Sequence, residues 1–454
     1  MTRRPLGLAL AALVATALGC TTGAPPAPSA SASAPPSDYP APAVRVPSEV
    51  VIGPVRVGRG PSDRPEVPPA PDLPRAYTFL SAPDFLNQDV ADVTDGGRRE
   101  LIDRRTGAIA NSTNAEYERA LAHVLDDMSD QEATDVLVAG DLVEGRWGRD
   151  DSRTGVFGPV RTQAQRWRAT RRAAGVYYPA WLERFDDRGL TTYPAVGDHE
   201  VGDDPWRDPG NTWVDFKRRH VPQLKALFVR EMLARPSGRH RFPERPTAGP
   251  AQDTAYAVRL DDNVLLVTLD VFERRDGDVH MSLDPDQLDW LERVLRRARR
   301  ADVPWVMVQG HTPMSKDVRV RNSTHLVYER GTRSALWRAM VDGGVDVYLS
   351  GEVHDQTVLV DDGIVQVSHG SLFYRGEASY VVGQATRKRL VLENRQFRGI
   401  VDYDDRLWTT SRKGAPGHIS YPDPSFVTGT LEARRTRSGG IRVEDAAGVL
   451  RPRR

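Results

Sequence analysis

The chain has 454 residues, and its 62 Lys and Arg side chains balance its 62 Asp and Glu side chains. The formal net charge is therefore zero, which gives no indication of attraction to nucleic acid or to an acidic membrane, and we expect no nucleic-acid partner. The single cysteine, Cys20, excludes a disulfide within the chain. Neither length nor composition indicates the oligomeric state.

The first 19 residues have the pattern of an export signal. Two arginines precede an apolar stretch, 6–18, which is too short to span a bilayer. Ala17-Leu18-Gly19-Cys20 then resembles the lipobox of bacterial lipoproteins, in which the cysteine carries the lipid. The alternative is a chance cysteine in a plain signal peptide. We expect residues 1–19 to be removed, Cys20 to be lipidated, and the protein to be exported and anchored to the outer face of the cell membrane.

Composition divides the rest of the chain into three parts. Residues 20–75 are rich in Pro, Ala and Ser, which predicts an extended tether. A folded domain is expected over 76–403, with an insertion at 203–250, and 404–454 is expected to be an irregular, polar extension. Loops of the insertion's size are often lids or specificity elements. A decorative insertion is the other interpretation, and both stay open.

Strands and helices are predicted to alternate within the folded domain. A buried strand over 77–81 is followed by amphipathic helices that lead into three further apolar runs. In chain order the pattern predicts a helix from 115, a strand at 135–139, a helix at 162–186, strands at 192–196, 255–260 and 264–269, a helix from 284, a strand at 305–309, a helix at 334–341, a strand at 345–350 and short β segments over 356–403. Such alternation, followed by a run of strands, indicates a layered α/β sandwich with a β-rich C-terminal part.

Four of these strands end in a glycine that is followed at once by a residue able to bind a metal ion. The four sequences are Gly140-Asp141, Gly197-Asp198-His199-Glu200, Gly310-His311 and Gly351-Glu352-Val353-His354, and Asp84 follows the first strand. Glycine permits a sharp turn of the backbone. Because sites in α/β sheets form at the carboxyl ends of strands, we expect these turns to meet.

The residue types predict a metal centre. Carboxylates and imidazoles together suit divalent or trivalent first-row ions. The ligand-type residues are Asp84, Asp141, Asp198, His311, Glu352 and His354, which is more than one ion needs. Two ions roughly 3.5–4 Å apart with one shared carboxylate would use them all, could hold a phosphoryl oxygen and could activate a water. His199, next to Asp198, is placed to protonate a leaving oxygen.

In their order and spacing, the four blocks resemble those of the calcineurin-like metallophosphoesterases. Residues 286–291 also look like the helix that this family carries between its third and fourth blocks, and the resemblance covers roughly 77–369. It implies an αββα sandwich and hydrolysis of phosphate mono- or diesters, with His199 as the general acid. It also implies two sets of metal ligands: Asp84, Asp141 and His354 for one ion, and Asp141, Asp198, His311 and Glu352 for the other.

Three positions depart from the family pattern. Asp198 stands where the family has Asn, Glu352 where it has His, and Leu86 where the first block has a His. Purple acid phosphatases, a branch of the family, also lack that first His and carry a Tyr at the position of Glu144. Glu144 is therefore a candidate ligand for the first ion. The added carboxylates favour iron or manganese, with zinc still possible.

The departures keep a second hypothesis open. A lipid-anchored binding or scaffolding protein could retain the phosphoesterase fold with a degraded site. The replacements at 144, 198 and 352 are all competent ligands, which favours the enzyme. His369 follows another predicted strand and is interpreted as a structural residue rather than a ligand. No motif indicates which phosphate ester is the substrate.

Overall fold

The computed structural model describes residues 64–84, 115–143, 145, 147–148, 157–201, 212–321, 323–371, 377–402, 418–436 and 440–453. All of them lie in the second of two units of the chain, Val55–Arg454. Cys20, Leu86 and Glu144 fall outside the described residues. The helices that are described include none with the length and apolar character needed to cross a bilayer.

A seven-stranded mixed sheet carries the first three predicted ligands. Its strands lie in the order β17-β16-β13-β12-β1-β2-β3. Their bounds in chain order are Tyr77–Ser81 (β1), Asp135–Val138 (β2), Thr191–Pro194 (β3), Ser379–Ala385 (β12), Arg389–Gln396 (β13), Phe426–Arg435 (β16) and Ile441–Gly448 (β17). β1, β2 and β3 pair in parallel, whereas β12 pairs with β1 antiparallel. The carboxyl ends of β1, β2 and β3 therefore share one edge.

A six-stranded sheet carries the remaining ligands. Its order is β10-β11-β9-β8-β5-β4. The bounds are Tyr256–Arg259 (β4), Val264–Thr268 (β5), Trp305–Gln309 (β8), Val347–Ser350 (β9), Thr357–Asp361 (β10) and Ile364–Ser368 (β11). Four adjacent strands of this sheet run parallel to one another: β11, β9, β8 and β5. The carboxyl ends of β8 and β9 therefore also share one edge.

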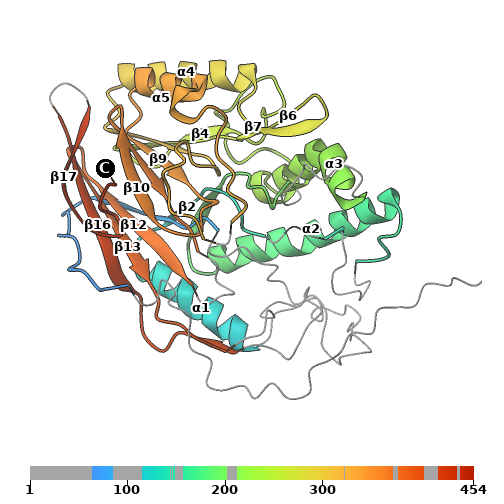
Figure 1. Cartoon of the computed structure of the whole chain (residues 1–454), viewed down its shortest axis with the longest axis horizontal. Coiled ribbons are helices and arrows are strands. Elements are labelled where there is room, and N and C mark those ends of the chain that lie inside the picture. Colours follow the sequence, from blue (N-terminus) through green and yellow to red (C-terminus); the bar gives the residue numbers. More distant parts are fainter. Residues whose placement is uncertain are drawn as a thin grey trace, which may run out of the picture. The chain divides into compact units, whose positions relative to one another are not determined.

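Alternating side chains place these strands in two cores. In β1, Phe79 belongs to the apolar cluster between the sheets and Leu80 to the cluster that includes the helices. Met307 and Val308 of β8 divide in the same way, as expected for strands covered on both faces. Figure 1 shows α4 and α5 above the strands and α1 below them. The predicted layered α/β sandwich is confirmed.

The helices begin where their sequences predict. α2 (Gln163–Asp186) starts with a capping box between Thr162 and Gln165. α4 (Pro285–Arg300) is capped by the side chain of Asp284, with proline at its first turn. The other helices are α1 (Ala115–Ser129), α3 (Thr212–Phe228) and α5 (Ala335–Gly343), with a π-helix at Val229–Leu233 and a 3-10 turn at Gly331–Arg333.

The insertion packs into the body, as far as it is described. Lys225 of α3 is buried, and its ammonium lies 2.6 Å from Oδ2 of Asp270 at the end of β5. Lys225 also donates to the carbonyl of Phe272, whose ring lies 5.9 Å from that of His311. A hairpin that was not predicted follows, β6 (Phe272–Arg275) with β7 (Asp278–Met281). The insertion therefore adjoins residues that contact the predicted site.

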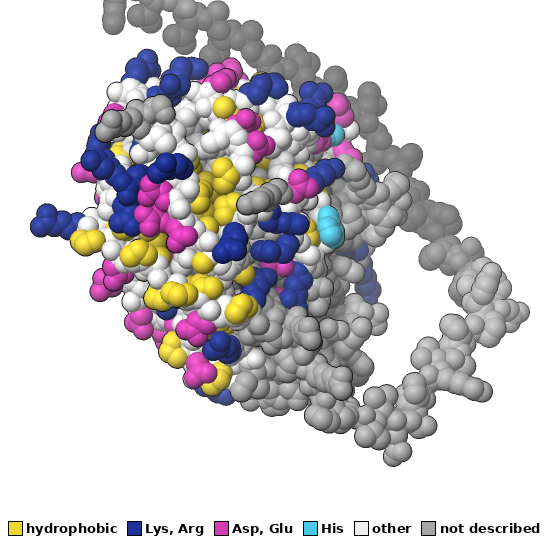
Figure 2. All heavy atoms as spheres, turned by 60° about the vertical axis from the view of Figure 1, so that its left-hand side comes forward, with side chains coloured by type: hydrophobic (Ala, Val, Ile, Leu, Met, Phe, Trp, Pro, Cys, Tyr) yellow, Lys and Arg dark blue, Asp and Glu magenta, His cyan; other side chains and the backbone are white. Residues whose placement is uncertain are grey.

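The expectation of irregular structure beyond residue 404 is wrong for the residues that are described there. A short pair, β14 (Ile400–Asp402) with β15 (His418–Ser420), precedes β16 and β17, which extend the seven-stranded sheet. These strands read as polar because cross-strand ion pairs such as Arg434–Glu444, at 3.0 Å, line them. Figure 2 shows charges of both signs interspersed on this side of the molecule. On the other face, Leu431 is buried in the core between the sheets.

Part of the predicted tether also lies against the body. The amide of Val67 donates to the carbonyl of Val427 in β16, and the amide of Leu73 donates to the side chain of Gln384 in β12. Leu73 is buried. Prolines kept this stretch from matching a strand pattern, although it can still hydrogen-bond to one.

Candidate metal centre

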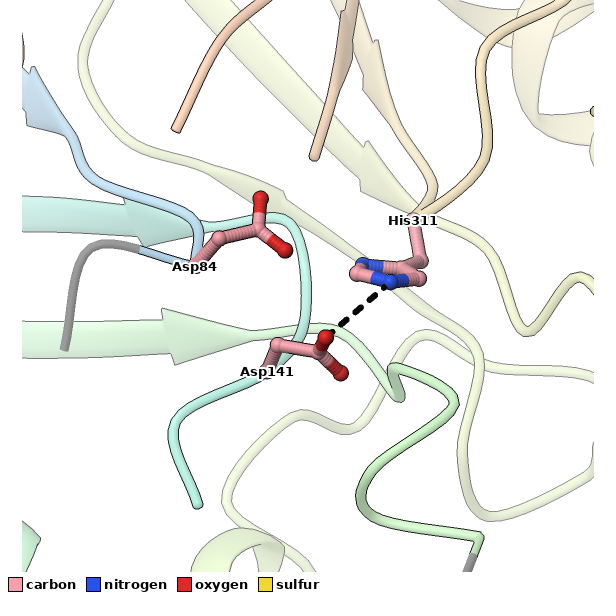
Figure 3. Close-up of side chains that lie close together, drawn as sticks. All are labelled: Asp84, Asp141 and His311. Atoms are coloured by element: carbon pink, nitrogen blue, oxygen red, sulfur yellow. Dashed lines mark ion pairs between the residues drawn. The ribbon is translucent and has the colours of Figure 1, made fainter. Parts of the chain in front are cut away.

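The six predicted ligands that the structure describes lie at the carboxyl ends of parallel strands from both sheets. All are buried, and they follow β1, β2, β3, β8 and β9: Asp84, Asp141, Asp198, His311, Glu352 and His354. Figure 3 shows the carboxylates of Asp84 and Asp141 and the imidazole of His311 turned toward one another. The seventh predicted ligand, Glu144, lies outside the described residues.

His311 lies at the centre of the cluster. Its Nε2 is 2.9 Å from Oδ1 of Asp198, 3.4 Å from Oδ2 of Asp141 and 3.5 Å from Oε2 of Glu352. Its Nδ1 donates to the carbonyl of Ala139 at 2.8 Å. Because the proton of the neutral ring is held at Nδ1, the lone pair of Nε2 faces the carboxylates, which is the arrangement of a metal-binding imidazole.

His354 is oriented in the same way toward Asp84. Its Nδ1 donates to the carbonyl of Arg321 at 3.1 Å, and its Nε2 lies 3.7 Å from Oδ1 of Asp84. The two oxygens of Asp84 accept from the backbone amide of Glu352 at 3.1 and 3.0 Å. The turn after β9 therefore contacts the turn after β1 directly.

The backbone at four of these ligands is left-handed. The φ angles are 57° at Asp84, 60° at Asp141, 68° at Glu352 and 49° at His354. Residues other than glycine adopt this conformation infrequently, and such residues cluster at functional sites when the surrounding structure enforces them. Each of these side chains is turned inward by a backbone that its residue type does not favour.

The preceding glycines are required by close approach. Gly140 has φ +94°, and a Cβ at this position would lie 2.5 Å from Nδ1 of His311. A Cβ at Gly197 would lie 2.1 Å from Oδ1 of Asp141. Any side chain at either position would displace a predicted ligand, which explains the Gly-ligand sequences in physical terms.

Glu200 is a site residue to which the sequence assigned no role. It is buried, and its Oε2 accepts from the amides of Asp141 at 2.9 Å and Gly197 at 2.7 Å. Its Oε1 accepts from the amide of Leu142 at 2.9 Å. Glu200 thus joins the turn after β2 to the turn after β3. Its sequence signal was its place in the Gly197-Asp198-His199-Glu200 block.

Burial and mutual charge perturb the titration of the cluster. Burial raises the pKa of Asp84 well above its usual range. Burial, reinforced by the charge of Asp141, raises the pKa of Glu200 to about 7. Burial by itself would lower the pKa of His311, but the carboxylates beginning with Asp141 outweigh it and raise that pKa well above the ordinary value. Burial lowers the pKa of His354, which favours its neutral, ligating form.

These residues fit bound metal ions. Among the described residues, the ion-pair partners of Asp84, Asp141 and Glu352 are histidines only. Within the described part of the chain, these three carboxylates are buried without a Lys or Arg partner, which is unfavourable unless another cation neutralises them. The described residues form three sets, and within each set the ligand atoms all lie within 4.8 Å of one another: Asp84, Asp141 and His311; Asp141, Asp198 and His199; and Asp198, His311 and Glu352.

His199 lies beside the cluster and is partly exposed, whereas His369 is fully buried and contacts Ser81. The side chain of His199 is 12% exposed, and its Nε2 lies 3.9 Å from Oδ2 of Asp141. The backbone amide of His199 donates to Oδ1 of Asp141 at 3.1 Å. His369 is fully buried, and its Nε2 lies 2.9 Å from the hydroxyl of Ser81. Burial lowers the pKa of His369 to about 3, so this ring is neutral.

The fold and the centre define a layered α/β protein with a buried carboxylate and histidine site for metal ions. The sequence profile of the calcineurin-like phosphoesterase family matches residues 114–356, more than half of the chain. The chain belongs to this family. Asp84, in the turn after β1, lies before the amino-terminal bound of the match.

Comparisons with individual proteins cover different parts of the chain. A stretch of 83 residues is 34% identical to an acid phosphatase of Aspergillus ficuum, covering 18% of this chain and 12% of that protein. A dimetal phosphatase of Danio rerio superposes with a TM-score of 0.41 and 12% identity, covering 76% of this chain and 99% of the other. The structure of PhoD gives a TM-score of 0.45 and 13% identity, with 85% of this chain and 74% of that chain covered.

Proposed function

We propose that the protein is a dinuclear metal-dependent phosphoesterase that hydrolyses phosphate mono- or diesters outside the cytoplasm. The observation that carries the proposal is the sharing of ligands. Asp141, Asp198 and His311 each belong to two of the three sets of ligand atoms. A shared buried carboxylate is what a site for two adjacent ions requires. Membership of a phosphoesterase family supports the same reaction class.

The ligands are assigned from the family resemblance, and the 3.7 Å between Asp84 and His354 and the 2.9 Å between Asp198 and His311 support it. One ion would be held by Asp84, Asp141 and His354, together with Glu144. The other ion would be held by Asp198, His311 and Glu352, and Asp141 would be shared between the two ions. When bound, the ions would supply Lewis-acid stabilisation of the phosphoryl oxygens and lower the pKa of a water. Because carboxylates outnumber imidazoles, iron or manganese is favoured over zinc.

His199 is proposed as the general acid. Its side chain retains 12% exposure, whereas the side chain of His311 has 0%, so His199 can reach a substrate at the rim of the cluster. Its backbone amide is held by Asp141, which ties the position of the imidazole to the centre of the site. From there the ring would transfer a proton to the leaving oxygen.

Cys20 and the Pro-rich tether extend the proposal to location. A lipidated Cys20 would hold the enzyme at the outer face of the cell membrane, where phosphate esters outside the cytoplasm are its substrates. Leu86, where the family has a His, further allies the chain with the purple acid phosphatase branch, which also lacks that His. Both inferences rest on sequence pattern.

Metal analysis combined with turnover tests the function. Protein purified without chelator should contain close to two ions per chain and should hydrolyse an aryl phosphate monoester or diester. Asp141→Asn should lose most of the metal and the activity, because it weakens the bridging ligand. Asp317→Asn, an exposed residue in the loop after His311, is the matched control. Wild-type protein that folds but takes up no ion on reconstitution would favour the binding-protein hypothesis instead.

A further inference from the structure

The two oxygens of Glu352 have different surroundings. Oε1 accepts hydrogen bonds from the hydroxyl of Ser323 at 2.5 Å, the hydroxyl of Thr324 at 2.8 Å and the amide of Leu326 at 3.0 Å. Oε2 instead faces Nε2 of His311 at 3.5 Å. Oε1 is thus fully occupied by donors, and Oε2 is directed into the cluster of ligands.

The two histidine ligands are oriented by hydrogen-bond acceptors, whereas Glu352 is oriented by donors. His311 and His354 each donate a ring N–H to a backbone carbonyl, that of Ala139 and that of Arg321. A carboxylate cannot donate such a bond, and an imidazole could not accept three. The donors around Glu352 are therefore complementary to a carboxylate and would not serve a histidine at the same position.

One loop supplies both kinds of contact. The segment between β8 and α5 provides the carbonyl of Arg321 to His354 and the donors of Ser323, Thr324 and Leu326 to Glu352. The amide of Arg321 also donates to the carbonyl of Val353, between the two ligands, at 2.8 Å. The loop therefore makes hydrogen bonds to each of the three residues Glu352, Val353 and His354.

We propose that Ser323, Thr324 and the amide of Leu326 form a carboxylate cradle that makes Glu352 a ligand through one oxygen only. Hydrogen bonds to an ionised carboxylate are strong and fix its orientation. With Oε1 held, Oε2 is presented to the ion that Asp198 and His311 also bind. Ser323 and Thr324 are positioning residues. The inference rests on the proposed function, because it assigns a role toward a metal ion.

The test is a calorimetric titration of metal-free protein with Mn²⁺ alone. The variant is the double substitution Ser323→Ala with Thr324→Val, which removes both hydroxyl donors and leaves Glu352 in place. One of the two dissociation constants should rise roughly 10–100-fold, the scale seen when groups that orient a metal ligand are removed, and the other should stay unchanged. Ser315→Ala, in the same loop but bonded to the amide of Asp317 instead, should change neither constant.

A second background separates positioning from general loop damage. In Glu352→Ala the cradle has no carboxylate to hold, so the double substitution should cause no further loss of Mn²⁺ affinity. Unchanged affinity in the wild-type background, equal weakening of both ions, or a further loss in the Glu352→Ala background would each overturn the cradle while leaving the proposed function in place. A wild-type protein that binds no Mn²⁺ would overturn both.

Discussion

The carboxylate of Glu200 accepts a hydrogen bond from the backbone amide of Asp141, with 2.9 Å between Oε2 and the nitrogen. The same oxygen accepts from Gly197, immediately before Asp198. Two turns that carry proposed ligands are thereby joined through one buried side chain, which is not among the proposed ligands. Their relative position depends on two acceptor oxygens, Oε1 and Oε2, which a side-chain amide or an alkyl group could not supply together.

Glu200→Gln should therefore destabilise the fold and the metal centre together. Gln keeps one acceptor oxygen but replaces the other with an NH2 group that only donates, so at least one buried backbone N–H among those of Asp141, Leu142 and Gly197 would lose its partner. An unsatisfied buried donor costs about 1–3 kcal/mol. Urea unfolding of metal-free protein and metal analysis measure the two effects. Glu183→Gln, the same change at an exposed position of α2, should have neither. Normal stability and metal content in Glu200→Gln would refute the structural role.

His199→Ala should retain both ions and lose roughly 10²–10⁴-fold in turnover, the usual contribution of a positioned acid. The loss should shrink for esters with good leaving groups, because their leaving oxygens need no proton. Steady-state kinetics across a series of aryl phosphates gives this dependence. An equal loss for every leaving group would exclude His199 as the acid.

Metal content and preference should respond to changes at Glu352 and Glu144, the two glutamates proposed as ligands. Glu352→His should shift the preference toward zinc, because imidazole is a softer ligand than carboxylate. It should also weaken the ion beside Asp198 and His311, because the donors around position 352 suit a carboxylate and not an imidazole. Glu144→Ala should weaken only the ion on the side of Asp84. Metal content after reconstitution with equimolar iron, manganese and zinc reports both effects. If content and preference match the wild type in both variants, neither glutamate is a ligand.

Cys20→Ala should release the protein from the membrane fraction, since it removes the proposed lipid attachment. Fractionation of cells that express each form, with mass spectrometry of the mature amino terminus, measures this. Ser29→Ala in the tether is the control. A wild-type protein that is already soluble and begins downstream of Cys20 would contradict the lipobox interpretation.

Asp346, at the opposite end of β9 from the turn that carries Glu352, predicts a pH effect on stability. Burial raises its pKa from 3.8 to about 7 in the folded state, against the opposing hydrogen bond from the amide of Val306 and the charge of Arg435. Between about pH 4 and pH 7 the folded chain holds a proton that the unfolded chain releases. This contribution to stability is full below that window and is lost as pH rises through 7.

Asp346→Asn should remove this pH dependence, because asparagine mimics the protonated acid and can still accept from Val306. The variant should match the wild type near pH 4 and be more stable above pH 7. Urea unfolding of metal-free proteins at both pH values checks this, and comparing each variant with the wild type cancels the titration of the metal cluster. Asp317→Asn is the exposed control. An identical pH profile for Asp346→Asn and the wild type would show that the group titrates normally.

The sequence by itself determined the features that are encoded locally. A strand, a glycine and a ligand-type residue are adjacent in the chain, so Asp141, Asp198, His311 and the turn at Glu352 could be selected from spacing and residue type. The same holds for α2 and α4, whose starts depend on Thr162 and Asp284 and the few residues after them. These predictions need no knowledge of which strands are neighbours.

Tertiary structure alone decided the features that depend on distant partners. Glu200 lies 59 positions from Asp141, and Thr324 lies 28 from Glu352, so no local pattern could assign their hydrogen bonds. β17 lies at the edge of its sheet, and its sequence is mostly polar. Only its pairing with β16 shows that it is a strand. The physical reason is the same in each case: a side chain's role is set by the groups that folding brings beside it, and the pattern along the chain does not record them.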